Sequence, residues 1–132
     1  MDPRFSLVVI TKDWHPINHV SFQLNNPGTQ LFETIKLEDT GVNQVMWPMH
    51  CVQGSLGSDL NLNLHYNNDK DIVVCKGKLE RVDSYSGFGS YPEKTELEDI
   101  LRNNQITKVF SCGLAFDYCV GSTAIDAAKL GF

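Results

Sequence analysis

The chain has 132 residues, of which 42% are hydrophobic and 20% are charged, and its formal net charge at pH 7 is −5. This length and composition indicate one small soluble globular domain with a single core. The negative charge and the lack of a Lys/Arg cluster argue against nucleic acid or an anionic membrane as a partner.

The cysteines and the apolar runs indicate the compartment. Neither the first ten residues nor any later run has the features of a signal peptide or a transmembrane span. The cysteines, at positions 51, 75, 112 and 119, have no Cys-x-x-Cys spacing and are too few for a disulfide scaffold. We therefore predict reduced thiols in a cytoplasmic protein.

The first predicted element is a strand at residues 5–11, a nearly continuous apolar run of the kind that is buried on both faces of a parallel sheet. It leads into Asp13 and His15, which are two residues apart, so their side chains share one face of extended backbone. A carboxylate and an imidazole at the carboxyl end of a strand form a candidate ligand site. A solvated turn is the alternative.

Two less regular stretches follow. Residues 18–40 have weak periodicity and frequent Asn, Gly and Pro, which predicts a long loop. His19 in this loop is expected at the surface, with a supporting role near a site as the alternative. Residues 46–55 group a tryptophan, a histidine and a cysteine around a proline, which indicates an ordered turn; His50 is either a third metal ligand or a hydrogen-bonded residue of that turn. For residues 56–66 a ragged helix and an extended segment both remain open.

A second short buried strand is predicted at residues 71–77, and it ends in Lys76. A lysine at the end of a buried strand is a candidate active-site cation, and a solvated lysine is the usual alternative. Residues 81–90 indicate a loop rich in Gly and Ser. Residues 95–103 are the clearest helix, with a capping-box pattern that begins at Thr95 and one apolar stripe.

The end of the chain brings a cysteine to a junction between strand and helix. Residues 107–113 predict a strand, and an apolar face that starts at Val120 predicts a helix capped by Gly131. Cys119 stands at or near the helix N-terminus, where unpaired N–H groups push a thiol toward thiolate, so it is a candidate nucleophile. A small buried cysteine is the alternative. The alternation of strands and helices predicts an α/β fold with a parallel sheet, in one domain.

Four separated motifs occur in one order: Asp13-Trp-His15-Pro, Trp47-Pro-Met-His50-Cys, Val74-Cys-Lys76-Gly and Gly113-Leu-Ala-Phe-Asp-Tyr-Cys119-Val. Together they resemble the nicotinamidases of the isochorismatase-like cysteine hydrolase superfamily, over essentially the whole chain. The resemblance implies a three-layer α/β/α fold with a parallel sheet. It also implies that residues 1–132 are a single domain that is truncated at both ends.

The resemblance implies a role for each matching residue. Cys119 would be the nucleophile, Lys76 the cation beside it, and the backbone N–H groups of Ala115 and Cys119 the oxyanion hole, with a cis peptide before Ala115. The residues that match the family's metal ligands are Asp13, His15 and His50, for one divalent ion, zinc first, with iron or manganese as alternatives. Those that match aromatic pocket positions are Trp47, Tyr85 and Tyr118. Asp83 matches an acidic position near the metal.

The implied reaction is hydrolysis of nicotinamide to nicotinate and ammonia through a cysteine thioester, in NAD salvage. Related isochorismatases lack the metal trio, so the three ligands favour a nicotinamide-type small-molecule substrate. Two alternatives stay open: a different small amide, and a catalytically impaired homologue that binds only a metal or a partner. A homo-oligomer is compatible with the sequence, which does not specify the oligomeric state.

The sequence departs from the family at its start. Nicotinamidases have an earlier strand with an Asp-x-Gln-x-Asp-Phe-type motif, whose first aspartate is the general base. The only acidic residue before the predicted first strand is Asp2, which an extended strand would place up to ~35 Å from Asp13. The family's strand would lie between residues 5–11 and 107–113, and another strand and helix would follow Phe132. We therefore expect a truncated chain in which proton transfer is slowed about 10²–10⁴-fold.

Overall fold

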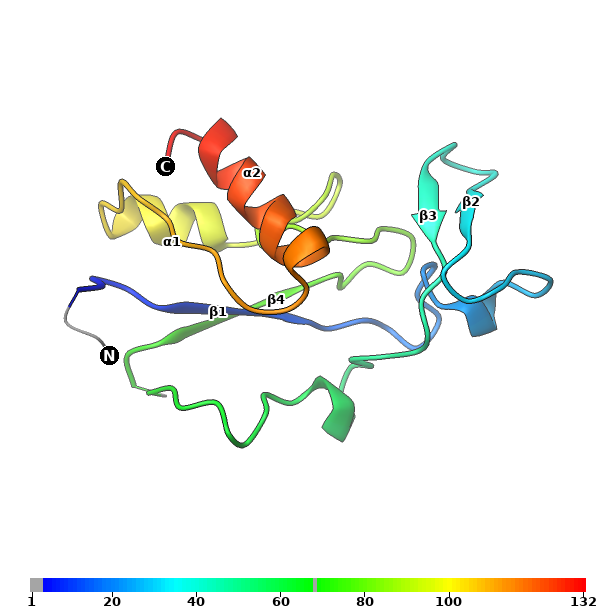
Figure 1. Cartoon of the computed structure of the whole chain (residues 1–132), viewed down its shortest axis with the longest axis horizontal. Helices are drawn as coiled ribbons and strands as arrows, with labels where there is room; N and C mark the ends of the chain where they lie inside the picture. Colours follow the sequence, from blue (N-terminus) through cyan, green and yellow to red (C-terminus); the bar gives the residue numbers. More distant parts are fainter. Residues whose placement is uncertain (1–3, 68) are drawn as a thin grey trace.

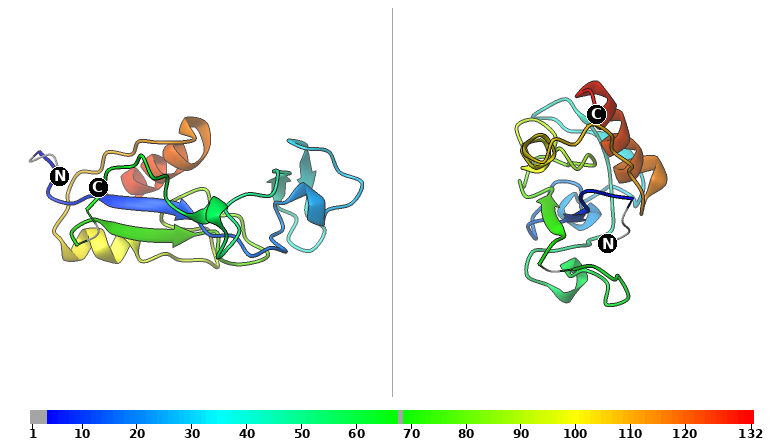
Figure 2. Two further views of the ribbon diagram at one scale, coloured as in Figure 1. Left: turned by 90° about the horizontal axis from the view of Figure 1, so that it is seen from below. Right: turned by 90° about the vertical axis from the view of Figure 1, so that its left-hand side faces the viewer.

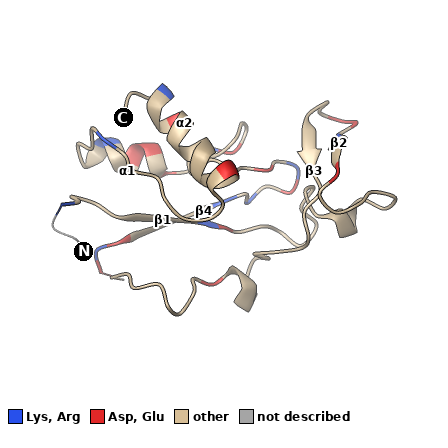
Figure 3. Ribbon diagram, viewed as in Figure 1, with Lys and Arg blue, Asp and Glu red and all other residues tan. Residues whose placement is uncertain are grey.

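The structure, a computed structural model, describes residues 4–67 and 69–132 of the chain. Two parallel strands and two helices lie toward one end of the elongated molecule, and a small hairpin lies toward the other (Figure 1 and Figure 2). Lys and Arg residues are spread along the chain rather than gathered on one element (Figure 3). No helix in the two described ranges is long and apolar enough to cross a membrane. Asp2 lies outside the described residues.

The two longest strands confirm the prediction of parallel strands. β1 (Val9–Asp13) and β4 (Ile72–Lys76) run parallel, and their register places Asp13 opposite Lys76. Both strands are rich in β-branched residues, which fit a pleated surface. The predicted burial of the first strand on both faces is wrong, because β1 is half buried and Thr11 is exposed. The ladder nevertheless brings a carboxylate and an ammonium to the same end of the sheet.

The described residues place helices on one side of the strand pair, whereas a three-layer fold needs them on both. In Figure 1 and Figure 2, α1 (Leu97–Asn103) and α2 (Gly121–Lys129) lie on one side of β1 and β4. Residues 56–66 run along the other side, and their only helical element is a 3-10 turn, η2 (Leu56–Ser58). The three-layer arrangement is therefore incomplete within residues 4–67 and 69–132, while the parallel α/β core is present.

Helix α1 confirms the clearest helix of the sequence pattern. It begins at Leu97, two residues after the predicted start, and the hydroxyl of Thr95 accepts a hydrogen bond from the Leu97 N–H at 3.3 Å. The same hydroxyl donates to the Gly87 carbonyl at 2.6 Å. Leu97 and Leu101 pack against Val74 of β4 and form the buried apolar cluster. This packing holds β4 against the helix and stabilises the end of the strand that carries the site.

The last helix is preceded by a wider turn that the sequence pattern does not predict. η3 (Phe116–Val120) is a π-helix, and α2 follows it without a break. The hydroxyl of Thr123 donates to the Cys119 carbonyl at 2.6 Å and joins the two helical segments. The predicted C-terminal cap is confirmed, because Gly131 follows α2 with a φ of +85°.

A two-stranded hairpin corrects the prediction of a continuous loop at residues 18–40. β2 (Thr34–Lys36) and β3 (Asn43–Val45) pair antiparallel, and a 3-10 turn, η1 (Gln23–Asn25), precedes them. The chain reverses with the help of Gly41, whose φ is +70°. Strands of three residues are too short to show the alternation on which a strand prediction depends.

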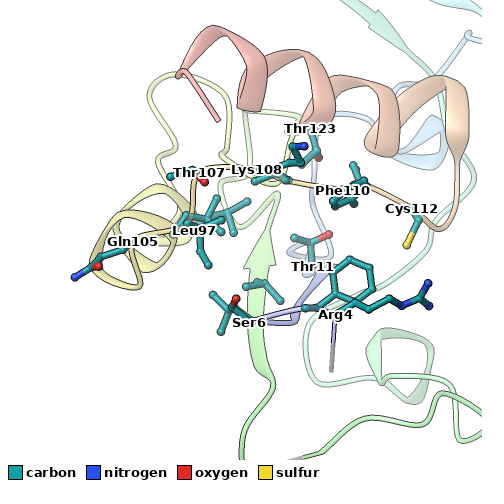
Figure 4. Close-up of a pocket in the computed structure, with 17 residues that line it drawn as sticks. Arg4, Ser6, Thr11, Leu97, Gln105, Thr107, Lys108, Phe110, Cys112 and Thr123 are labelled. Carbon is teal, nitrogen blue, oxygen red and sulfur yellow. The ribbon is translucent and has the colours of Figure 1, made fainter. Parts of the chain in front are cut away.

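The strand predicted at residues 107–113 is not formed by the part of the chain that the structure describes. The segment faces β1 across a cleft of about 410 Å³, and Figure 4 shows Thr11 and Phe110 on its two sides. A strand needs a partner for its N–H and C=O groups, and an apolar run in the sequence does not supply one. The described residues therefore form two separate two-stranded sheets instead of one larger parallel sheet.

Candidate active site

Lys76, the last residue of β4, is the centre of the site. Only 3% of it is exposed, so the alternative of a solvated lysine is wrong. Its Nζ donates to Asp13 Oδ1 at 2.5 Å, to the Ser84 carbonyl at 2.8 Å and to Cys119 Sγ at 3.4 Å. The first contact follows from the register of β1 and β4, and the third brings η3 to the same point. A carboxylate, an ammonium and a thiol are thus in direct contact.

Burial and charge act in opposite directions on this pair of groups. Burial alone would lower the pKa of Lys76, but the Asp13 carboxylate and the Cys119 sulfur outweigh it and the pKa of Lys76 is raised. Burial raises the pKa of the Cys119 thiol, and the Lys76 ammonium opposes this shift without cancelling it. The shift toward thiolate predicted from a helix N-terminus is thus not seen: the pKa of Cys119 is raised, and the residue is half buried within η3, ahead of α2.

Asp13, His15 and His50 come together as the sequence motifs imply. Each offers one ligand atom, and these atoms lie within 4.8 Å of one another. Asp13 Oδ2 is 3.9 Å from His15 Nε2 and 3.8 Å from His50 Nε2. The same carboxylate contacts Lys76 through its other oxygen, so one side chain joins the three-residue cluster to the Lys76–Cys119 pair.

The hydrogen bonds of the two imidazoles suit metal binding. His15 Nδ1 lies 2.8 Å from the Gly77 carbonyl, and His50 Nδ1 lies 2.8 Å from the Pro48 carbonyl. Because a carbonyl oxygen only accepts, each neutral ring carries its proton on Nδ1 and presents the lone pair of Nε2 toward Asp13. Two imidazole nitrogens and a carboxylate oxygen are donors that zinc, iron and manganese accept. The three residues therefore fit a divalent ion.

His19 packs against His15 in the interior of the protein, so its predicted surface position is wrong. It is fully buried, and its ring centroid is 4.2 Å from that of His15. Its Nδ1 is 2.8 Å from the Ser21 hydroxyl, and its Nε2 is 3.1 Å from the Val82 carbonyl. Both ring nitrogens are thus occupied, and the ring supports His15 by packing against it at an interplanar angle of 35°. Val20 and Phe22, which flank Ser21, are the sequence signal that could have indicated burial.

The three predicted pocket aromatics lie together at one side of the site. Trp47 Nε1 donates to the Tyr85 hydroxyl at 2.9 Å, and the ring of Tyr118 is 4.9 Å from that of Trp47 and 5.3 Å from that of Tyr85. Burial, followed by the charge of Asp83, raises the pKa of Tyr85. The rings join residues 47, 85 and 118, which are far apart in the sequence, into one aromatic wall.

Two further residues at the site were not identified from the sequence. Gln44 of β3 is buried, and its Nε2 donates to Asp83 Oδ2 at 2.7 Å, which fixes the acidic residue expected near the metal. Ser84 supplies the carbonyl that accepts from Lys76. Backbone acceptors leave no signature in a sequence, and Gln44 lies in a hairpin that the pattern did not predict. The peptide bond between Leu114 and Ala115 is cis, as the resemblance implies.

Residues 10–132 match the isochorismatase domain family. The chain belongs to the isochorismatase family. This membership agrees with the α/β class of fold that the four motifs imply, and the matched range contains both helices, β4 and all of β1 except Val9.

Within the isochorismatase family, the similar proteins include nicotinamidases. The nicotinamidase of Acinetobacter baylyi is 42% identical over 96% of this chain and 59% of its own length. The nicotinamidase of Escherichia coli is 41% identical over 98% of this chain and 60% of its own length. This chain thus spans about 60% of the length of the curated relatives that it matches.

Solved structures of isochorismatase relatives superpose closely on this fold. A nicotinamidase and pyrazinamidase from Acinetobacter baumanii has a TM-score of 0.89 at 43% identity, over 97% of this chain and 61% of that one. The yeast nicotinamidase bound to the inhibitor nicotinaldehyde has a TM-score of 0.83 at 30% identity, over 99% and 65%. A pyrazinamidase from Pyrococcus horikoshii in complex with zinc has a TM-score of 0.71 at 36% identity, over 96% and 56%.

Proposed function

We propose that this chain carries the catalytic site of a nicotinamidase, which hydrolyses nicotinamide to nicotinate and ammonia. The observation that carries the proposal is the contact of Lys76 Nζ with Cys119 Sγ at 3.4 Å, beside Asp13 and two imidazoles. A nucleophile next to a cation, within reach of a metal cluster, suits acyl transfer from a small amide. The similarity to nicotinamidases selects the amide of nicotinamide within this class.

The proposed reaction proceeds through a thioester on Cys119. The sulfur bonds to the carboxamide carbon, the C–N bond breaks, and the proton lost from the thiol ends on the departing ammonia. Lys76 contacts the sulfur as an ammonium and stabilises the negative charge that the sulfur gains as its proton leaves. Water then cleaves the thioester, which gives the carboxylic acid and restores the thiol. The backbone N–H groups of Ala115 and Cys119 stabilise the oxyanion, at about 3–4 kcal/mol for each donor.

The proposed cofactor is one divalent ion, zinc first, with iron or manganese as alternatives, held by Asp13, His15 and His50. A bound ion would offer a coordination position to a pyridine nitrogen. The aromatic wall of Trp47, Tyr85 and Tyr118, whose rings meet edge to face, provides apolar ring surfaces against which a pyridine ring packs. Ligand set and wall together orient a carboxamide toward Cys119.

A matched pair of amides tests the substrate. Benzamide has the size and the carboxamide of nicotinamide but lacks the ring nitrogen. We expect ammonia release from nicotinamide to exceed that from benzamide by more than about 10-fold. Benzamide cannot make the contact of the ring nitrogen, and the loss of that contact is expected to cost more than about 1.4 kcal/mol, which corresponds to 10-fold. Equal rates would contradict recognition of the ring nitrogen. Release from neither amide, by a chain that binds zinc, would instead favour the metal-binding alternative.

A matched pair of histidine variants tests the metal site. His50→Ala removes one of three ligands, whereas His65→Ala removes an exposed histidine outside the cluster. Competition with a chromogenic chelator is expected to show zinc affinity reduced by more than about 100-fold in His50→Ala, since loss of a direct ligand exceeds the effect of an outer-shell change. His65→Ala is expected to bind as the unmodified chain does. Similar affinities in the two variants would exclude His50 as a ligand.

A further inference from the structure

A buried glutamate outside the motifs holds the turn that follows β4. Glu93 is only 6% exposed. Its Oε2 accepts from the Gly77 N–H at 2.9 Å and its Oε1 from the Lys78 N–H at 2.8 Å. Among the residues that the structure describes, no Lys, Arg or His forms an ion pair with Glu93. A buried carboxylate is costly unless it is fully hydrogen-bonded, so these two peptide N–H groups are its compensation.

The two peptide units that Glu93 binds are the ones that support the metal ligands. The unit between Gly77 and Lys78 presents its N–H to Glu93, and its C=O accepts from His15 Nδ1 at 2.8 Å. The preceding unit presents the Gly77 N–H to Glu93, and its C=O, that of Lys76, accepts from the Trp14 N–H at 2.9 Å. Trp14 lies between Asp13 and His15 in the sequence. Each carboxylate oxygen is therefore connected through one peptide to the strand end that carries the ligands.

The turn is also shaped to bring its backbone against the imidazole. Gly77 has a φ of +64°, and a Cβ at this position would lie 2.3 Å from His15 Cε1. On the other side, a Cβ at Gly89 would lie 2.6 Å from the Glu93 carbonyl oxygen. The two glycines thus permit close contact of the backbone with the His15 ring and with the Glu93 main chain.

We propose that Glu93 is a positioning residue, which orients His15 through the Gly77–Lys78 peptide and holds the Lys76 turn beside Cys119. A charged acceptor on the peptide N–H strengthens the peptide carbonyl as an acceptor for His15 Nδ1–H. This fixes the tautomer that leaves Nε2 free, and it makes Nε2 a better ligand. The inference rests on the proposed metal site.

The test compares Glu93→Gln with Glu96→Gln. A glutamine at position 93 offers one acceptor and turns an NH₂ group toward the second N–H. At position 96 the same change removes a charge that is exposed and 4.0 Å from Lys78 Nζ. Zinc affinity, measured by chelator competition, is expected to fall about 10–100-fold in Glu93→Gln and to be unchanged in Glu96→Gln. Equal affinity in the unmodified chain and a folded Glu93→Gln variant would overturn the proposal.

A second measurement does not depend on metal or activity. Imidazole ¹⁵N spectra of the metal-free chain are expected to show His15 with its proton on Nδ1, and Glu93→Gln is expected to shift His15 toward a mixture of tautomers. A purely structural role would lower thermal stability and leave this spectrum unchanged in the folded fraction. If the unmodified chain binds no divalent ion, the metal site is wrong and this spectrum alone decides the role of Glu93. Where Glu93→Gln does not fold, Glu93→Asp keeps both acceptors on a shorter side chain, and the same two measurements apply.

Discussion

Replacing Cys119 with Ala is expected to reduce ammonia release from nicotinamide by about 10⁴-fold or more. In the proposed reaction the sulfur forms the bond to the carboxamide carbon, and alanine offers nothing in its place. Cys119 is half buried, and the variant loses one atom while the backbone hydrogen bonds of η3 and α2 remain. The measurement is a coupled ammonia assay, with circular dichroism to confirm the fold and zinc titration to confirm the metal site.

Cys112→Ala is the matched control for this variant. Cys112 is exposed, lies seven residues earlier and belongs to the segment that follows α1. Its removal is expected to leave the rate within a factor of about two, as for a surface substitution away from the site. Ammonia release that survives in Cys119→Ala would exclude the thioester route. If the unmodified chain releases ammonia no faster than Cys119→Ala does, metal or partner binding is left as the function.

The positions of the residues at the carboxyl ends of β1 and β4 were predictable, because a small number of physical rules determines them. An apolar run indicates a buried strand, parallel strands end at the same edge, and polar residues that follow such runs meet there. Asp13, His15 and Lys76 satisfy these rules, and the structure brings all three together. The order of the motifs added His50 and Cys119 to the predicted site. No local pattern predicts that these two residues lie close to Asp13, His15 and Lys76.

Other features depend on contacts between distant segments, which no local pattern specifies. His19 is buried because a ring from residue 15 and a carbonyl from residue 82 pack on it. The thiol of Cys119 has a raised pKa because burial outweighs the neighbouring ammonium, a balance that the sequence does not reveal. Residues 107–113 have the composition of a strand, but a strand exists only where a partner supplies hydrogen bonds, and a cleft lies in that place.

Asp13 is the residue on which both halves of the site depend. One carboxylate oxygen accepts from Lys76, and the other faces the Nε2 atoms of His15 and His50. A change at this position therefore alters the environment of the ammonium and the ligand set at once. No other side chain in the cluster contacts both groups among the residues that the structure describes.

Asp13→Asn is expected to weaken zinc binding by more than about 100-fold and to destabilise the chain by about 3 kcal/mol. The amide is a poorer ligand, and it leaves the Lys76 ammonium buried without a countercharge; the lower end of the range for broken buried pairs applies because Asp13 is 22% exposed. Asp39→Asn is the control, since it breaks an exposed pair with Arg81. Chelator competition and denaturant unfolding measure the two effects.

The double variant Asp13→Asn/Lys76→Met separates the two roles of Asp13. Methionine removes the unpaired ammonium and keeps an apolar stem of similar length, so most of the lost stability is expected to return, as when both partners of a buried pair are replaced. Zinc affinity is expected to stay low, because the ligand is still absent. Recovery of both quantities together would contradict a ligand role for Asp13, and recovery of neither would show that its contact with Lys76 contributes nothing to stability. Because one carboxylate contacts both the ammonium and the metal ligands, stability and metal affinity are expected to change independently in these variants.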